Sequence, residues 1–170
     1  NLIYAINQIK TNYFIANNRQ MMLTFAPETA YVQGGMSAYG GIWGGYLPLL
    51  HAFRNDLNYI HVQLYNSGSM YGIDGIIYSQ GTADFILAMS EAVIQGFNTA
   101  GGFFQGIPAA KVAVGLPACP LAAGGGFVST SVVRSAVKYL NGTGPKPGSY
   151  TLVQTGGYPN LAGMMTWSIN

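Results

Sequence analysis

Two Gly-rich stretches of the sequence, residues 28–45 and 66–79, bring aromatic side chains next to amides and hydroxyls. The aromatic residues in and beside these stretches include Tyr31, Tyr39, Trp43, Tyr65, Tyr71 and Tyr78. This combination suits a sugar, because the C–H faces of a sugar stack on flat rings while its hydroxyls need fixed hydrogen-bond partners. The same rings could instead fill a hydrophobic core, so composition alone leaves both interpretations open.

The other reactive side chains indicate neither a metal site nor a nucleophile. His51 and His61 have no paired acid or hydroxyl in a recognisable arrangement, so we expect both to be structural. Cys119 is the single cysteine; it has no partner for an internal disulfide and no Cys/His spacing that would hold zinc. We expect it to be a small buried residue, and we expect no metal and no cofactor.

Charge is scarce in this chain. The sequence has 7 basic and 5 acidic residues, a net charge of +2, and 49% hydrophobic residues. This composition excludes disorder, and without a Lys/Arg cluster we expect neither a nucleic-acid partner nor a membrane surface. The apolar runs are shorter than the ~18 residues of a membrane span. We expect a soluble, secreted, extracellular protein whose targeting segment is not part of this sequence, which begins at Asn1.

Strand-like and helix-like segments alternate along the chain. Short runs rich in β-formers occupy residues 21–26, 59–65, 111–116 and 163–169. Helical spacing of apolar residues covers residues 2–14, 47–53, 80–97 and 129–140, with Thr82 and either Ser129 or Thr130 as N-caps. This alternation predicts a parallel β/α architecture, in which ligands bind at the carboxyl ends of the strands. The two Gly-rich stretches follow such strand ends.

Four motifs at these strand ends carry a specific resemblance. They read L-T-F-A-P-E-T at residues 23–29, V-Q-L-Y-N at 62–66, V-G-L-P-A at 114–118 and M-T-W-S-I-N at 165–170. In this order they resemble the fifth to eighth strands of a glycoside hydrolase family 18 chitinase of the secreted bacterial type, which is similar to the plant class III chitinases. The resemblance implies an α/β fold, the (β/α)8 TIM barrel. About four of its β/α units would be present, with residues 1–170 as the carboxyl-terminal half of one catalytic domain.

The family's general acid is missing from this chain. The resemblance implies a fourth strand with the signature D-x-x-D-x-D-x-E, but no two of the acids here are separated by two positions. Those acids are Glu28, Asp56, Asp74, Asp84 and Glu91. A complete barrel needs about 250 residues. We therefore expect the parent protein to be a chitinase and this chain alone to be inactive.

By the resemblance, Tyr65 of the Q-x-Y-N motif would hold the substrate's own acetamido group, which attacks the anomeric carbon in this substrate-assisted, retaining mechanism. Gln63 would add an amide contact from the same side of the strand, and Asn66 would lie beside them. Without the resemblance, Gln63 and Tyr65 could be an inward-facing pair satisfied by neighbouring side chains.

Trp167 would form the floor under the sugar, followed by a non-proline cis peptide bond to Ser168, although an apolar strand alone suggests a core residue. Glu28 either lines the cleft, caps a helix, or pairs with Arg19 or Arg54. With Tyr31, these complete the predicted substrate-binding set.

The partners implied by the resemblance are chitin or N-acetylglucosamine oligosaccharides and the missing amino-terminal half of the barrel. The strands at residues 21–26 and 163–169 would be open edges, which we expect to pair with that half or with a second copy. One alternative function is a chitin-binding, lectin-like protein on the same fold without hydrolysis. Another is a sugar-binding half-barrel that acts alone.

Overall fold

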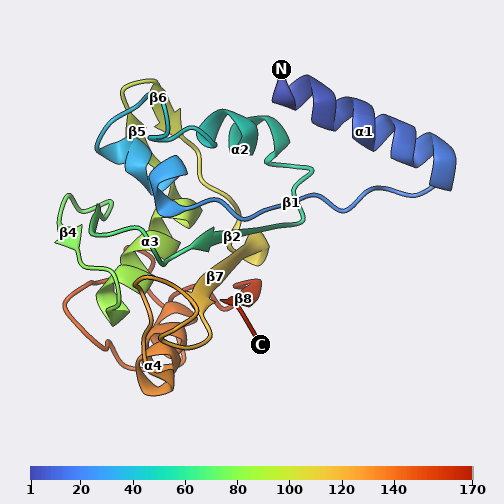
Figure 1. Ribbon diagram of the computed structural model, residues 1–170. Helices are drawn as coiled ribbons and strands as arrows, with labels where there is room; N and C mark the ends of the chain where they lie inside the picture. The colour runs from blue at the N-terminus through green and yellow to red at the C-terminus, as the bar shows by residue number, and fades with distance from the viewer. Residues whose placement is uncertain (170) are drawn as a thin grey trace.

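The computed structural model describes residues 1–169 and is built on a four-stranded parallel sheet (Figure 1). Its order is β1-β2-β7-β8, so the four predicted strands lie side by side in sequence order. Their bounds are Thr24–Phe25 for β1, Tyr59–Gln63 for β2, Val112–Pro117 for β7 and Gly163–Trp167 for β8. The parallel β/α prediction is confirmed.

Strand β1 is much shorter than the predicted run of residues 21–26. The amide of Leu23 donates to the Asn58 side chain at 2.8 Å instead of joining the backbone ladder. Pairing is then interrupted after Phe25 and resumes as an isolated bridge between Glu28 and Gln63. Because Pro27 has no N–H to donate, only its carbonyl takes part, accepting from the Gln63 amide at 2.8 Å.

The predicted helices are all present. Their bounds are Leu2–Asn17 for α1, Leu47–Phe53 for α2, Ala83–Gln95 for α3 and Thr130–Leu140 for α4. Thr82 caps α3 as predicted, accepting a hydrogen bond from the Phe85 amide at 3.1 Å. Ser129 occupies the N-cap of α4, but its hydroxyl pairs with that of Ser131 and not with the backbone.

Two antiparallel hairpins stand where the sequence suggested loops or helix. The first pairs β3 (Met70–Tyr71) with β4 (Ile77–Tyr78), and the second pairs β5 (Phe97–Thr99) with β6 (Gly102–Phe104). Single 3₁₀ turns occur at Thr29–Tyr31, Gln33–Met36 and Ala109–Lys111. The prediction that α3 reaches Phe97 is wrong, because Gly96 turns the chain at φ +80° and a Cβ there would lie 2.0 Å from the Phe104 carbonyl oxygen.

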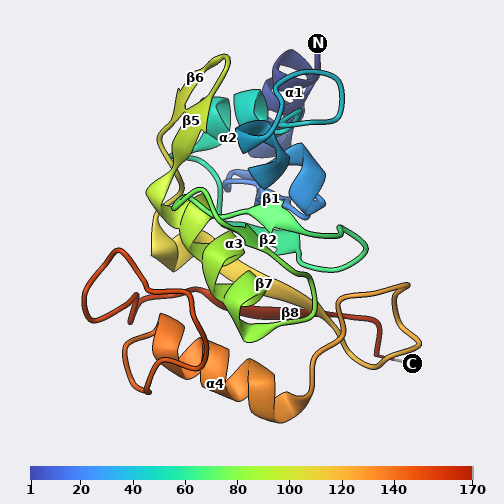
Figure 2. The ribbon, with the colours of Figure 1, turned by 90° about the vertical axis from the view of Figure 1, so that its left-hand side faces the viewer.

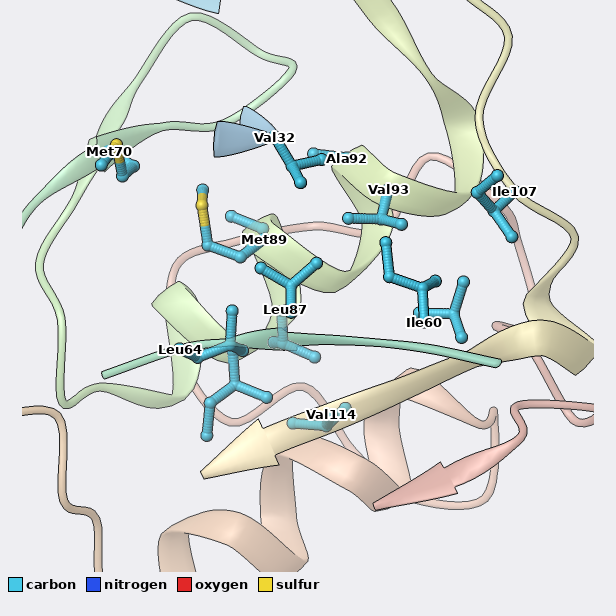
Figure 3. Packing of buried hydrophobic residues seen from close by; sticks show 14 of the residues in the cluster. Val32, Ile60, Leu64, Met70, Leu87, Met89, Ala92, Val93, Ile107 and Val114 are labelled. Carbon is cyan, nitrogen blue, oxygen red and sulfur yellow. The ribbon is translucent and has the colours of Figure 1, made fainter. Parts of the chain in front are cut away.

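Helix α3 packs on one face of the sheet and forms the centre of the core. In Figure 3, Ile60, Leu64 and Val114 from the β2 and β7 segments point toward Leu87 and Val93 of α3. Alternate residues of β2 are buried, so Ile60 and Val62 face α3 while His61 and Gln63 face the opposite side. The opposite face is therefore the one that carries the predicted site residue Gln63.

Helix α1 stands apart from this core (Figure 1). None of its residues is buried, although Ile3 and Ile6 pack partly against the body of the protein. Lys10 joins it to the loop after α2 through an ion pair with Asp56, and the Lys10 ammonium lies 5.4 Å from the centre of the Phe53 ring. Within residues 1–169, the helices are too short or too polar to cross a bilayer.

Candidate functional site

Three of the predicted site residues meet where β1 and β2 end. Glu28 forms a backbone bridge with Gln63, and Tyr65 follows two residues beyond the end of β2. The Gln63 amide nitrogen donates to the Ala26 carbonyl at 2.6 Å, which fixes the orientation of the side chain. Its amide oxygen has no hydrogen-bond partner within the described residues, so it remains available to accept from a ligand.

The Tyr65 hydroxyl is held at this site without a protein partner. The side chain is only 4% exposed, and no residue among 1–169 hydrogen-bonds to the hydroxyl. Three side-chain polar atoms in residues 1–169 are both buried and without a hydrogen-bond partner: Thr29 Oγ1, Gln33 Oε1 and His61 Nδ1. The Tyr65 hydroxyl has no partner either but is not one of these buried atoms, so it reaches solvent. Burial raises the pKa of Tyr65, and the negative charge of Glu28 raises it further. Tyr65 is therefore a neutral hydrogen-bond donor beside a carboxylate.

The loop between β7 and α4 packs across the backbone of Tyr65. The Gly125 carbonyl accepts from the Asn66 amide at 3.1 Å. Gly126, at φ +98°, comes so close that a Cβ would lie 2.7 Å from the Tyr65 Cα. Only glycine allows this approach, so the loop fixes where the Tyr65 ring lies.

Asn66 turns the chain sharply after Tyr65. It adopts the left-handed conformation, with φ +54°, and its side chain is exposed. The Gln80 side chain holds the turn, because its amide oxygen accepts from the Ser67 amide at 2.6 Å and the Gly68 amide at 3.2 Å.

Trp167 ends β8 and is not a core residue. It is 55% exposed, so the core interpretation of this tryptophan is wrong. Strand β8 reaches it in register with Pro117, and its carbonyl accepts from the Ala118 amide at 2.6 Å. The predicted cis peptide bond between Trp167 and Ser168 is present. The last motif residue, Asn170, lies outside the described residues. The β7–α4 loop and the end of β8 project on the same side of the molecule (Figure 2).

Tyr31 occupies a different environment from Gln63 and Tyr65. It lies in the turn after β1 and packs edge-on against Tyr46, with ring centres 5.7 Å apart. The other aromatic residues of the Gly-rich stretches are dispersed as well. Tyr39 packs on Gly101, Trp43 packs on Gly34, and Tyr78 is buried against Tyr150. The aromatic residues that the sequence groups together therefore do not form one cluster.

The structure tests the cysteine prediction, whereas the structural role of the two histidines stays a prediction. Burial lowers the pKa of His61, which is part-buried on the same side of β2 as Gln63. Cys119 is exposed, so the expectation of a buried cysteine is wrong. Strand β7 ends at Pro117, and Cys119 therefore belongs to the Gly-rich loop that leaves the sheet. Among residues 1–169, no three His, Cys, Asp or Glu side chains come together as metal ligands would.

Glu91 is a buried carboxylate whose role the sequence analysis missed. It lies fully buried on α3 and accepts from the hydroxyls of Tyr150 and Tyr158 at 2.7 and 2.6 Å and from the Val153 amide at 2.9 Å. About two helical turns earlier on α3, Asp84 accepts hydrogen bonds from the amide and hydroxyl of Ser149. The only sign of this role in the sequence is that an acid interrupts an apolar helical run. Its hydrogen-bond partners lie 59 to 67 residues later in the sequence, so no local pattern reveals them.

Comparisons with known proteins agree on one group. No family model matches the sequence. The chain is 51% identical over its whole length to "Chitinase D" of Niallia circulans and 50% identical to "Chitinase Chi52" of Paenibacillus xylanexedens, and it covers 32% of each. It thus spans about a third of the length of these curated relatives.

The fold agrees with the sequence relatives. A crystal structure of a family GH18 chitinase from Chromobacterium violaceum superimposes with a TM-score of 0.87 and 39% identity over 98% of this chain and 44% of that one. Its barrel supplies the context for the four parallel strands described above. Its sequence is similar along the whole length to chitinases and its fold is similar to that of a GH18 chitinase, so this chain is consistent with the carboxyl-terminal half of a glycoside hydrolase family 18 chitinase.

Proposed function

We propose that the protein containing this chain hydrolyses β-1,4-linked N-acetylglucosamine polymers by the retaining, substrate-assisted mechanism. The observation that carries the proposal is the solvent-accessible Tyr65 hydroxyl, which has no partner among residues 1–169 and lies beside the ends of β1 and β2. A neutral phenol there donates to the acetamido carbonyl and orients it for attack on the anomeric carbon. The names of the two relatives, both chitinases, support chitin as the substrate.

The other predicted site residues would complete the substrate-binding surface around Tyr65. The Gln63 amide oxygen accepts from the sugar, Asn66 contributes an exposed amide, and the exposed face of Trp167 stacks beneath the ring at the cleavage point. Burial raises the pKa of Tyr65 and the negative charge of Glu28 raises it further, so both favour the neutral phenol. Tyr31, the remaining member of the proposed set, packs edge-on against Tyr46.

We further propose that the general acid comes from another segment of the protein. Four of the five carboxylates are engaged elsewhere: Asp56 with Lys10, Asp74 with Tyr78, Asp84 with Ser149, and Glu91 with two tyrosines. Residues 1–170 would be one half of a single catalytic domain, completed by an amino-terminal half. The open outer edges of β1 and β8 support this arrangement, since unpaired strands seek partners. An insoluble polymer substrate also favours action outside the cell.

The test is turnover of a chitin oligosaccharide by the full-length protein, with the product anomer followed by NMR. We expect retention of configuration in the wild type and a loss of turnover in Tyr65→Phe. Tyr59→Phe, at the opposite end of β2, is the matched control. Inversion, or equal rates in Tyr65→Phe and wild type, would contradict the proposal. The lectin-like alternative predicts binding without turnover, and the relatives' names give it no support.

A further inference from the structure

The β5–β6 hairpin turns one face into the core and the other toward solvent. Phe97 pairs with Phe104 and Asn98 with Phe103, and directly opposed residues project from the same face of a hairpin. The Phe97 and Phe104 rings are buried, with centres 5.3 Å apart. Asn98 is exposed, and Phe103 is 58% exposed. The outer face therefore presents an amide directly beside an aromatic ring.

The β3–β4 hairpin follows the same pattern. Met70 and Tyr78 are a buried pair, whereas Tyr71 and Ile77 are an exposed pair. Both hairpins lie on the left-hand side of Figure 1. Between them is a hollow of about 440 Å³, lined in part by Tyr71, Asn98 and Phe103. Its lining includes none of the six predicted site residues.

A second hollow adjoins the first and shares Phe103 with it. Its volume is about 380 Å³, and its lining includes Tyr39 and Thr99. The Tyr39 ring packs on the hairpin turn, where a Cβ on Gly101 would lie 2.2 Å from it. Phe103 thus lines both hollows, and each hollow has a tyrosine in its lining as well, Tyr71 in the first and Tyr39 in the second.

The chemistry of this surface fits a neutral sugar chain. No Asp, Glu, Lys or Arg lines either hollow. The Asn98 side chain makes no hydrogen bond within residues 1–169, so both its donor and its acceptor are available. Exposed rings beside a free amide provide stacking and hydrogen bonding together, which is the combination that a sugar requires. Two adjoining hollows suit consecutive units of a chain.

We propose that the hairpin surface of Tyr39, Tyr71, Asn98 and Phe103 binds a β-linked N-acetylglucosamine chain. Phe103 stacks on one sugar unit, and the Asn98 amide hydrogen-bonds to its substituents. The identity of the sugar rests on the proposed function. The exposed ring, the free amide and the two hollows are structural observations that are independent of it. The role of the surface is to hold polymer on the protein, with no part in bond cleavage.

The experiment measures binding of the full-length protein to insoluble chitin by depletion from solution, in parallel with turnover of soluble triacetylchitotriose. Phe103→Ala and Asn98→Ala should each bind chitin more weakly, Phe103→Ala by roughly fivefold, and turnover of the short substrate should be unchanged. Phe103→Trp, which keeps a stacking face, should bind as wild type does. Val153→Ala, which removes a side chain 65% exposed that lines neither hollow, is the control and should also bind normally.

Wild-type chitin binding by both Phe103→Ala and Asn98→Ala would overturn the proposal. A change in oligomeric state with unchanged chitin binding would also overturn it, because the surface would then contact a second copy. If Phe103→Ala lowers the melting temperature, Asn98→Ala decides, since its side chain has no core contact to lose. If the wild-type protein does not turn over triacetylchitotriose, only the proposed function is refuted. Chitin binding that depends on Phe103 would still support the hairpin surface.

Discussion

Gly126 crosses over Tyr65 with no room for a side chain. A Cβ at position 126 would lie 2.7 Å from the Tyr65 Cα and 2.9 Å from the Leu64 carbonyl oxygen. The loop that follows β7 therefore sets the position of Tyr65, which follows the neighbouring strand β2. This contact makes the tyrosine's placement testable without altering the tyrosine itself.

Gly126→Ala should lower stability and impair turnover together. Its positive φ costs about 1–2 kcal/mol, and the collision with Tyr65 adds about 1–3 kcal/mol. Gly156→Ala is the control, because Gly156 has φ +84° with nothing within 4 Å of its Cβ position and so loses only the backbone contribution. Denaturant unfolding and kcat measure the two effects. Equal losses in the two variants would exclude a positioning role for the contact.

Tyr65→Phe should lower kcat by roughly 100-fold, equivalent to ~2.7 kcal/mol. The hydroxyl matters most when the acetamido oxygen becomes the nucleophile, so ground-state binding should change far less. Single-turnover kinetics alongside oligosaccharide binding separate the two. A variant that lost only binding affinity would show that Tyr65 is a contact residue without a role in the chemical step.

Trp167→Ala should weaken substrate use with little effect on stability. More than half of the side chain is exposed, so its removal leaves only a small cavity, whereas the lost stacking costs about 0.5–1.5 kcal/mol. Trp167→Phe should recover part of the loss in kcat/KM. A large drop in the melting temperature for Trp167→Ala would instead indicate a packing role.

The stability contributed by Asp84 should depend on pH. Burial alone would raise the pKa of Asp84, but hydrogen bonds from Ser149 and Tyr150 outweigh it and the pKa is lowered. The stabilisation is therefore complete above the ordinary value of 3.8 and is lost as the pH falls through the lower folded value. Unfolding of wild type and Asp84→Asn should differ at neutral pH and converge in acid. A constant difference would contradict this role.

The 170-residue chain alone should not hydrolyse chitin oligosaccharides, since the proposed acid lies elsewhere. It should also associate with itself, because β1 and β8 form the two edges of its sheet and Met22 and Met164 are exposed beside them. Turnover assays and sedimentation at micromolar concentration test both points. Turnover by rigorously purified chain, or a stable monomer with open edges, would contradict the half-barrel proposal.

Local patterns predicted what local forces determine. The cap at Thr82, the helix Leu47–Phe53 and the period-two burial of β2 depend on neighbours within a few residues. The alternation of elements likewise predicted the parallel order of the four strands, but it left the place of Glu28 open, and the structure puts it beside Gln63.

Features that depend on distant contacts were not predictable in this way. The β5–β6 hairpin begins where Gly96 approaches Phe104, and this contact ends α3 early. Cys119 is exposed because the chain leaves the sheet at Pro117, and hydrophobicity alone gives no sign of that exit. Glu91 finds its partners 59 to 67 residues later in the sequence, beyond the reach of any helical or strand periodicity.

The buried carboxylate of Glu91 has a consequence for cleavage of the chain by proteases. The connection from α4 to β8, rich in Gly and Pro, resembles an accessible cutting site. Yet the amides of Ser149, Tyr150, Val153 and Gln154 all donate to Asp84 or Glu91, so a protease cannot draw this backbone into its active site without first breaking these hydrogen bonds. The rate of nicking in this segment therefore reports how often α3 releases it.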